Sequence, residues 1–114
     1  KNIIDKLVNG LKSFPNLVIL SDEVYDRLIF EKKEIPSLLN YPDLYERLIV
    51  LNGWSKTYAM TGWRLGYIGA PKTIASACTK VQGQFTSGTS SITQKAAIAA
   101  MEADPSVLKE MISK

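Results

Sequence analysis

The chain has 114 residues, about the size of one domain, and 46% hydrophobic with 22% charged residues excludes a disordered or fibrous protein. The net charge of +3 is only mildly basic, and the lysines are spread without an arginine-rich stripe, so we expect no nucleic-acid binding. No apolar run approaches the roughly 18 residues that span a bilayer and no signal-peptide pattern opens the chain, so we expect no membrane association.

Cysteine and histidine content limits the chemistry further, since the chain has one cysteine, Cys78, and no histidine. A single cysteine forms no internal disulfide, which fits a reducing compartment, and we expect the cytoplasm. With so few soft ligands we expect no zinc site and no Cys–His catalysis. We interpret Cys78, which lies in a helix-like stretch, as a small core residue.

The first half of the chain alternates helix with strand. Apolar residues at helical spacing predict an amphipathic helix over residues 2–12. The apolar run at 17–20 predicts a strand buried on both faces of a parallel sheet. Residues 25–30 fit either a helical turn or a strand, and residues 42–47 predict a short helix.

The second half continues this alternation. Residues 47–53 predict a second buried strand, ended by Asn52-Gly53, and residues 63–70 predict a third, stopped by Pro71. A helix is expected from Pro71 to about residue 84, and another ends near residue 102. Asp104-Pro105 begins a last helix, with aspartate as its cap.

This order of elements indicates an α/β fold, but three strands are too few to complete such a sheet. The chain begins without methionine, directly in a helix, and it ends in a helix. We therefore expect a segment of a larger protein, whose partial sheet leaves apolar faces uncovered, so that the segment alone is unstable or associates.

Reactive side chains follow the predicted strands. Asp22 follows the first strand, and Ser55 and Lys56 follow the second. Ligands of open α/β sheets bind beyond the carboxyl ends of the strands. If the third strand runs antiparallel, its beginning at Arg64 comes to the same edge, so that a carboxylate, a lysine, a serine and an arginine share one crevice.

Two stretches carry a family resemblance: "SDEVYDRLIF" at 21–30 and "NGWSKTYAMTGWRLGY" at 52–67. Together with "SSITQKAAIAAM" at 90–101, they resemble the fold-type I, class I/II aminotransferases that use pyridoxal 5'-phosphate, with the aspartate aminotransferase branch most similar. The resemblance covers nearly the whole chain. It departs at Trp54, which is bulkier than the residue expected before the serine.

The resemblance implies a fold and a place for the chain within it. The fold is a three-layer α/β/α large domain with a mostly parallel sheet and one antiparallel strand. Residues 1–114 would be the central part of this cofactor-binding domain, without the remainder of the enzyme. Family members form homodimers, and the stretch Thr86–Ser91 is similar to the loop that approaches the neighbouring subunit's cofactor.

The resemblance also assigns the reactive residues. Lys56 would form a Schiff base with the cofactor aldehyde, which requires a primary amine. Asp22 would pair with the protonated ring nitrogen and keep the ring an electron sink. Tyr25 would hydrogen-bond the ring hydroxyl, Arg64 would hold the phosphate with its guanidinium fork, and Ser55 would add a hydroxyl donor to the phosphate.

Neighbouring residues receive structural interpretations. Gly53, Gly62 and Gly66 are expected to serve backbone geometry and close approach. We interpret Glu23 as a solvated neighbour of the site. The residues expected to pack around the site are Tyr58, Met60, Trp63 and Tyr67.

The function implied is transfer of an amino group between an amino acid and a 2-oxo acid, and we expect the isolated segment to be inactive. Three alternatives stay open. A lyase or synthase of the same fold would keep the same lysine and arginine, and product analysis would distinguish it. An aminotransferase-like ligand domain of a transcriptional regulator would have a helix-turn-helix region upstream. A non-catalytic structural fragment would bind no cofactor.

Overall fold

The computed structural model describes residues 2–30 and 35–113 of the chain. Its regular elements, in order, are α1 (Asn2–Leu11), β1 (Ile19–Asp22), the 3-10 helices η1 (Leu38–Asn40) and η2 (Pro42–Arg47), β2 (Leu48–Gly53), the 3-10 helix η3 (Thr61–Trp63), β3 (Gly66–Gly69), α2 (Lys72–Phe85), α3 (Ser91–Glu102) and α4 (Ser106–Ile112). The predicted alternation of helix and strand is confirmed. Residues 25–30, which the sequence left open, are neither strand nor helix: a turn covers 24–27.

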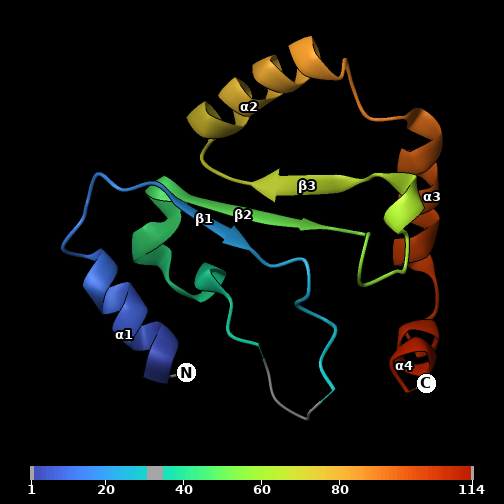
Figure 1. Cartoon of the computed structure of the whole chain (residues 1–114), viewed down its shortest axis with the longest axis horizontal. Coiled ribbons are helices and arrows are strands. Elements are labelled where there is room, and N and C mark those ends of the chain that lie inside the picture. Colours follow the sequence, from blue (N-terminus) through green and yellow to red (C-terminus); the bar gives the residue numbers. More distant parts are fainter. Residues whose placement is uncertain (1, 31–34, 114) are drawn as a thin grey trace.

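The three strands form one mixed sheet in the order β1-β2-β3. β1 and β2 run parallel, with Ile19 opposite Leu48 and Asp22 opposite Leu51. β3 runs antiparallel to β2, and its first residue, Gly66, lies opposite Gly53, the last of β2. The ends of β1 and β2 and the start of β3 therefore meet at one edge (Figure 1). The α/β fold class with one antiparallel strand is confirmed.

The core lies between α1, the two 3-10 helices η1 and η2, and one face of the sheet. Its buried side chains are Val8, Leu38, Leu44, Leu48 and Val50. The helical spacing of α1 directs an apolar stripe to this core, and period-two alternation does the same for β2. Leu44 is fully buried, so the short helix η2 supplies the centre of the core.

Two polar contacts fasten this layer. The guanidinium of Arg47, at the end of η2, donates to the carbonyl oxygens of Leu11, Phe14 and Leu17 at 2.9 Å each. These carbonyls belong to the end of α1 and the loop after it, where backbone acceptors lack intrahelical partners. The Tyr41 hydroxyl donates to Asp5 at 2.6 Å, and this bond raises the pKa of Tyr41 above its ordinary value.

The burial predicted for the first strand is wrong. β1 begins at Ile19, two residues after the predicted start, and Leu17, Val18 and Leu20 are each at least half exposed. The described chain is a slab of 42 × 42 × 18 Å, and its radius of gyration of 16.3 Å exceeds the ~13 Å expected of a compact domain of this length. Its helices therefore do not enclose both faces of the sheet.

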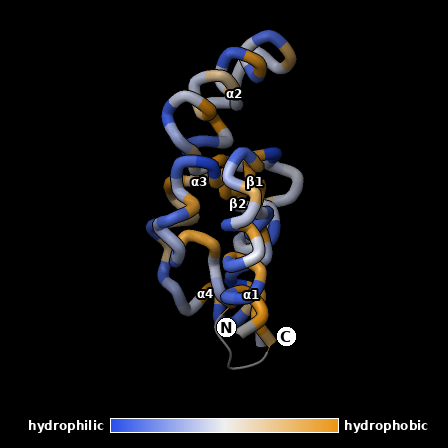
Figure 2. The backbone as a smooth tube through the Cα atoms, turned by 90° about the vertical axis from the view of Figure 1, so that its left-hand side faces the viewer, coloured by the Kyte–Doolittle hydropathy of each residue, from blue (hydrophilic) through white to orange (hydrophobic). Residues whose placement is uncertain are grey.

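Helix α2 shows the same openness. It stands apart from the sheet beyond β3 in Figure 1, and none of its side chains is buried. Its apolar positions, orange in Figure 2, lie among hydrophilic ones on a helix that solvent reaches. Cys78 belongs to α2 and is exposed, so its interpretation as a core residue is wrong.

The third strand is shorter than predicted because the backbone before it is irregular. Residues 61–63 form η3, and Arg64 then takes a left-handed conformation with φ of 54°. A Cβ atom on Gly53 would lie 2.8 Å from the carbonyl oxygen of Leu65, which confirms the close approach expected there. A Cβ atom on Gly66 would lie 3.3 Å from the backbone carbonyl oxygen of Asn52. A Cβ atom on Gly62 would meet open space, and the φ of Gly62 is not positive.

The last helix begins as predicted. The Asp104 carboxylate accepts a hydrogen bond of 2.8 Å from the backbone N–H of Ser106, the first residue of α4. This bond lowers the pKa of Asp104 below its ordinary value. The aspartate therefore satisfies one of the free N–H groups at the start of α4, as a helix cap does.

Candidate functional site

The edge where the strand ends meet contains the first two predicted site residues. Asp22 is the last residue of β1, and its Oδ1 accepts a hydrogen bond of 3.2 Å from the N–H of Val24. The chain then turns back, with the N–H of Asp26 donating to the carbonyl of Glu23 at 3.0 Å. This turn contains Tyr25, and Asp22 and Tyr25 line one cavity of about 240 Å³.

Lys56 reaches the same turn from the loop after β2. Its Nζ lies 5.8 Å from the centre of the Tyr25 ring, within the range of a cation–π contact. Lys56 follows the end of β2 at Gly53 by three residues, and the loop folds tightly because the N–H of Ala59 donates to the Lys56 carbonyl at 3.0 Å. A carboxylate, a phenol and an amine are therefore grouped at this edge.

Ser55 and Arg64 are joined through a residue that the sequence did not single out, Thr61. The Ser55 hydroxyl donates to Thr61 Oγ1 at 3.2 Å, and Thr61 Oγ1 donates to the Ser55 carbonyl at 2.9 Å. The Arg64 guanidinium donates to the Thr61 carbonyl, also at 2.9 Å. Thr61 therefore closes the loop that follows β2 and holds the hydroxyl and the guanidinium on the same short segment.

The five predicted site residues thus form two groups. Asp22, Tyr25 and Lys56 make one, Ser55 and Arg64 make the other, and the peptide bond between Ser55 and Lys56 links them. Arg64 is exposed, and the cavity that Asp22 and Tyr25 line is not lined by the other three residues. The arrangement offers an amine, a carboxylate and a guanidinium on adjoining segments of one sheet edge.

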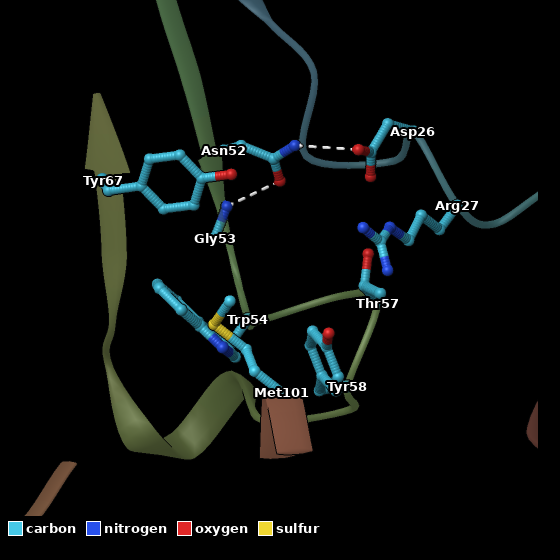
Figure 3. A pocket seen from close by; sticks show the side chains of 9 residues that line it. All are labelled: Asp26, Arg27, Asn52, Gly53, Trp54, Thr57, Tyr58, Tyr67 and Met101. Carbon is cyan, nitrogen blue, oxygen red and sulfur yellow. Dashed lines mark hydrogen bonds between the residues drawn. The ribbon is translucent and has the colours of Figure 1, made fainter. Parts of the chain in front are cut away.

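A second cavity, of about 260 Å³, lies beside this edge (Figure 3). The Trp54 and Tyr67 rings meet there edge to face, with centres 5.4 Å apart, and Tyr58 also lines it. Tyr58 and Tyr67 line this cavity, which fits the packing role expected of them, but Tyr67 and Trp63 are each about half exposed. Thr57 is buried, and its hydroxyl has no hydrogen-bond partner among the described residues.

The interpretation of Glu23 as a solvated neighbour is wrong. Its carboxylate is partly buried and accepts hydrogen bonds from the hydroxyls of Ser21 and Ser37, at 2.9 and 2.7 Å, and from the N–H of Leu38 at 3.2 Å. Its own N–H donates to the carbonyl of Leu51 on β2 at 2.9 Å. Glu23 therefore fastens the end of β1 both to η1 and to β2.

Asp26 and Asn52 were also missed. The Asn52 amide donates to the Asp26 carboxylate at 3.0 Å, and both residues line the second cavity. The sequence indicates Asn52 only as the end of a strand. The presence of three acidic residues within five positions, 22 to 26, was the available hint, since so many carboxylates beside a strand end require partners.

Comparison with known proteins identifies the chain. The family model for aminotransferase class I and II matches residues 2–114. The chain belongs to this family. A bifunctional aspartate aminotransferase and glutamate/aspartate-prephenate aminotransferase of Petunia hybrida is 44% identical over 101 residues, which are 89% of this chain and 21% of that protein.

Solved structures of aminotransferases share the fold. The aspartate aminotransferase of Thermotoga maritima superposes with a TM-score of 0.86 and 35% identity, over 99% of this chain and 29% of that one. The aromatic aminotransferase of Pyrococcus horikoshii gives a TM-score of 0.91 and 31% identity, over 99% and 31%. The chain thus spans between a fifth and a third of the length of these relatives. None of its described helices is long and apolar enough to cross a membrane.

The side chains at the edge fit the cofactor that this family uses, pyridoxal phosphate. Lys56 supplies the primary amine that the aldehyde requires, and Asp22 supplies a carboxylate for the pyridinium nitrogen. Only one oxygen of Asp22 accepts a hydrogen bond from a described residue, which leaves the other for a ligand. Arg64 and Ser55 are the donor types that a phosphate prefers.

Proposed function

We propose that the complete natural polypeptide containing residues 1–114 is a pyridoxal phosphate-dependent aminotransferase, which transfers an amino group between an amino acid and a 2-oxo acid. The grouping of Lys56, Tyr25 and Asp22 at one sheet edge carries this proposal, with the Lys56 amine 5.8 Å from the Tyr25 ring. The family match over nearly the whole chain supports it.

Lys56 has two tasks in this proposal. Its primary amine is the group that would hold the cofactor aldehyde at the end of β2. As a free amine, Lys56 would be the base that removes the proton from the substrate α-carbon. The cofactor supplies an electron sink that stabilises the negative charge developing at that carbon. The partly buried position of Lys56 limits the water that competes for the amine.

Asp22 and Tyr25 act on the ring. The Asp22 carboxylate holds a proton on the ring nitrogen, since an opposite charge favours the protonated form of a nitrogen base. The Tyr25 phenol donates a hydrogen bond to the ring oxygen. The turn between these two residues is short and internally hydrogen-bonded, so their spacing is fixed before a ligand arrives.

Arg64 and Ser55 hold the phosphate. The guanidinium offers a planar pair of donors that matches two phosphate oxygens, and the hydroxyl adds a third donor. Thr61 contacts both residues and keeps them on one loop. Arg64 is exposed in this structure, where a large anion can reach it.

The wider setting is also a proposal. Residues 1–114 form the central part of the cofactor-binding large domain, and this segment alone is inactive because it spans about a fifth of a relative's length. The complete protein acts as a cytoplasmic homodimer, with Thr86–Ser91 near the subunit interface. Two large apolar side chains beside this stretch, Phe85 and Ile92, are mostly exposed and support such an interface.

The test is Lys56→Ala in the complete polypeptide, with Lys72→Ala, an exposed lysine at the start of α2, as the matched control. Lys56→Ala should lose the yellow absorbance of the attached cofactor and the formation of 2-oxo acid, while Lys72→Ala keeps both. Unchanged absorbance in Lys56→Ala would refute the assignment of the lysine. Release of the nitrogen as ammonia, without transfer of the amino group to a second 2-oxo acid, would refute transamination.

A further inference from the structure

Among the described residues, one side-chain hydrogen bond ties the turn that follows β1 to β2. Asp26 Oδ2 accepts a hydrogen bond of 3.0 Å from Asn52 Nδ2, and both residues are partly buried (Figure 3). Asp26 immediately follows Tyr25, and Asn52 lies in β2, four residues before Lys56. The bond therefore joins the segment that contains the phenol to the segment that leads to the amine.

The direction of this hydrogen bond is fixed by a second one. The N–H of Gly53 donates to Asn52 Oδ1 at 2.7 Å, so the amide oxygen faces Gly53 and the amide nitrogen is directed at Asp26. Gly53 is held in the sheet, where it lies opposite Gly66 on β3. A carboxylate can only accept, and an amide held in this way can only donate, so the two side chains are matched.

The other end of the turn is anchored separately. Glu23 binds η1 through its carboxylate and β2 through its N–H. Between the Glu23 and Asp26 anchors only Val24 and Tyr25 remain. The position of the Tyr25 ring over Lys56 thus depends on Asp26, because Tyr25 itself is more than half exposed and has little packing to hold it.

We propose that the Asp26–Asn52 hydrogen bond is a positioning device that sets Tyr25 against Lys56. This inference rests on the proposed function for its catalytic consequence. Neither residue touches the cofactor in this scheme: Asp26 acts through Tyr25, and Asn52 provides the fixed donor on β2. Loss of either partner lets the turn drift, so the phenol and the amine are aligned for a smaller fraction of the time.

The experiment uses the complete polypeptide with four changes: Asp26→Ala, Asn52→Ala, both together, and the exchange Asp26→Asn with Asn52→Asp. The exchange keeps one carboxylate and one amide, and the new carboxylate on β2 still accepts from the N–H of Gly53. Asp43→Ala is the matched control, because Asp43 is an exposed aspartate that pairs only with Lys12 among the described residues.

Two readouts are measured. In the cofactor-free protein, hydrogen–deuterium exchange of residues 22–28 should rise in both single alanine variants and return toward the original rate in the exchange variant. In the loaded protein, kcat should fall about tenfold in each single variant with KM within about twofold, the size expected for one lost hydrogen bond. The double alanine variant should be no worse than either single one.

The inference would be overturned by additive losses of kcat in the double alanine variant or by a swapped Asp26→Asn, Asn52→Asp variant whose kcat is as low as that of the single variants. Unchanged hydrogen–deuterium exchange in Asp26→Ala would overturn it as well. A change in Asp43→Ala equal to that in Asp26→Ala would also overturn it. If the unchanged polypeptide neither binds the cofactor nor transfers amino groups, the proposed function fails. Hydrogen–deuterium exchange of the cofactor-free protein still decides whether the Asp26–Asn52 hydrogen bond holds the turn.

Discussion

Arg64 combines a reactive side chain with an unfavourable backbone, and this combination can be tested. Its φ of 54° and ψ of 52° lie in the left-handed region, where a residue with a Cβ is disfavoured. Arg64→Ala and Arg64→Gly both remove the guanidinium and its bond to the Thr61 carbonyl. The two variants differ only in whether a Cβ atom remains at this position. The pair therefore separates the cost of the backbone from the role of the side chain.

The expected magnitude follows from two opposing contributions. A Cβ atom in the left-handed conformation costs about 1–2 kcal/mol in the folded state. Glycine also gives the unfolded chain more conformational entropy than alanine does, which destabilises the folded state by about 0.4–1 kcal/mol and offsets part of the gain from removing the Cβ atom. Arg64→Gly should therefore be more stable than Arg64→Ala by about 0.5–1 kcal/mol. Both variants should bind the cofactor about 10- to 100-fold more weakly, as loss of a charged hydrogen-bond donor predicts.

The assay is urea unfolding of the cofactor-free complete polypeptide, followed by titration of each variant with pyridoxal phosphate. A shift in the unfolding midpoint at constant slope measures the stability difference. The reasoning is refuted if Arg64→Ala is as stable as Arg64→Gly. It is equally refuted if either variant binds the cofactor as tightly as the unchanged protein, since Arg64 then does not hold the phosphate.

Two further predictions concern stability. Leu44→Ala should lower the free energy of unfolding by about 2–5 kcal/mol, because Leu44 is fully buried. Leu39→Ala is the control, and it should change that free energy by no more than about 0.5 kcal/mol, because Leu39 is half exposed. Urea unfolding midpoints compare the two variants, and equal losses would contradict the placement of Leu44 in the core. The hydrogen bond to Ser106 lowers the pKa of Asp104 in the folded state below its ordinary value of 3.8. The ionised carboxylate therefore stabilises α4 at pH values above 3.8, and this stabilisation is lost as the pH falls through the pKa of the folded state. Amide exchange of α4, corrected for intrinsic rates, should therefore rise in acid for the unchanged protein but not for Asp104→Asn, and identical pH responses would refute this.

Much of the fold could be predicted from the sequence, because its elements have strong local determinants. The helical spacing of α1 and the Asp104 cap of α4 act within a few residues of chain. The antiparallel direction of β3 was implied by the family resemblance but not by the residues of the strand alone, and the structure confirms it. The topology of strand ends predicted that Asp22 and Lys56 share one edge, whereas Tyr25 was assigned only by the resemblance, and the roles of all three residues stay predictions.

The rest depended on contacts that no local pattern encodes. Burial of Leu20 and Cys78 was overestimated, since apolar content does not reveal whether a second layer covers that face. Glu23 was misread because its partners include Ser37 and Leu38, more than ten positions away. An acidic residue in a loop is expected to be solvated unless a distant segment of the chain supplies hydrogen-bond donors, and such tertiary contacts are not visible in the local sequence.

The contacts found at the sheet edge suggest how the site is built. Lys56 has a ring contact with Tyr25, and Asp22 has one hydrogen bond from a neighbouring N–H, so both keep most of their bonding capacity for a ligand. Other residues then have to fix the positions of these side chains, because reacting groups must be held in a defined geometry to act together. Glu23 beside Asp22, and Asp26 beside Tyr25, each bind a separate element. Hydrogen bonds to other elements thus belong to the residues adjacent to Asp22 and Tyr25, which fixes the backbone there while the reactive side chains stay available.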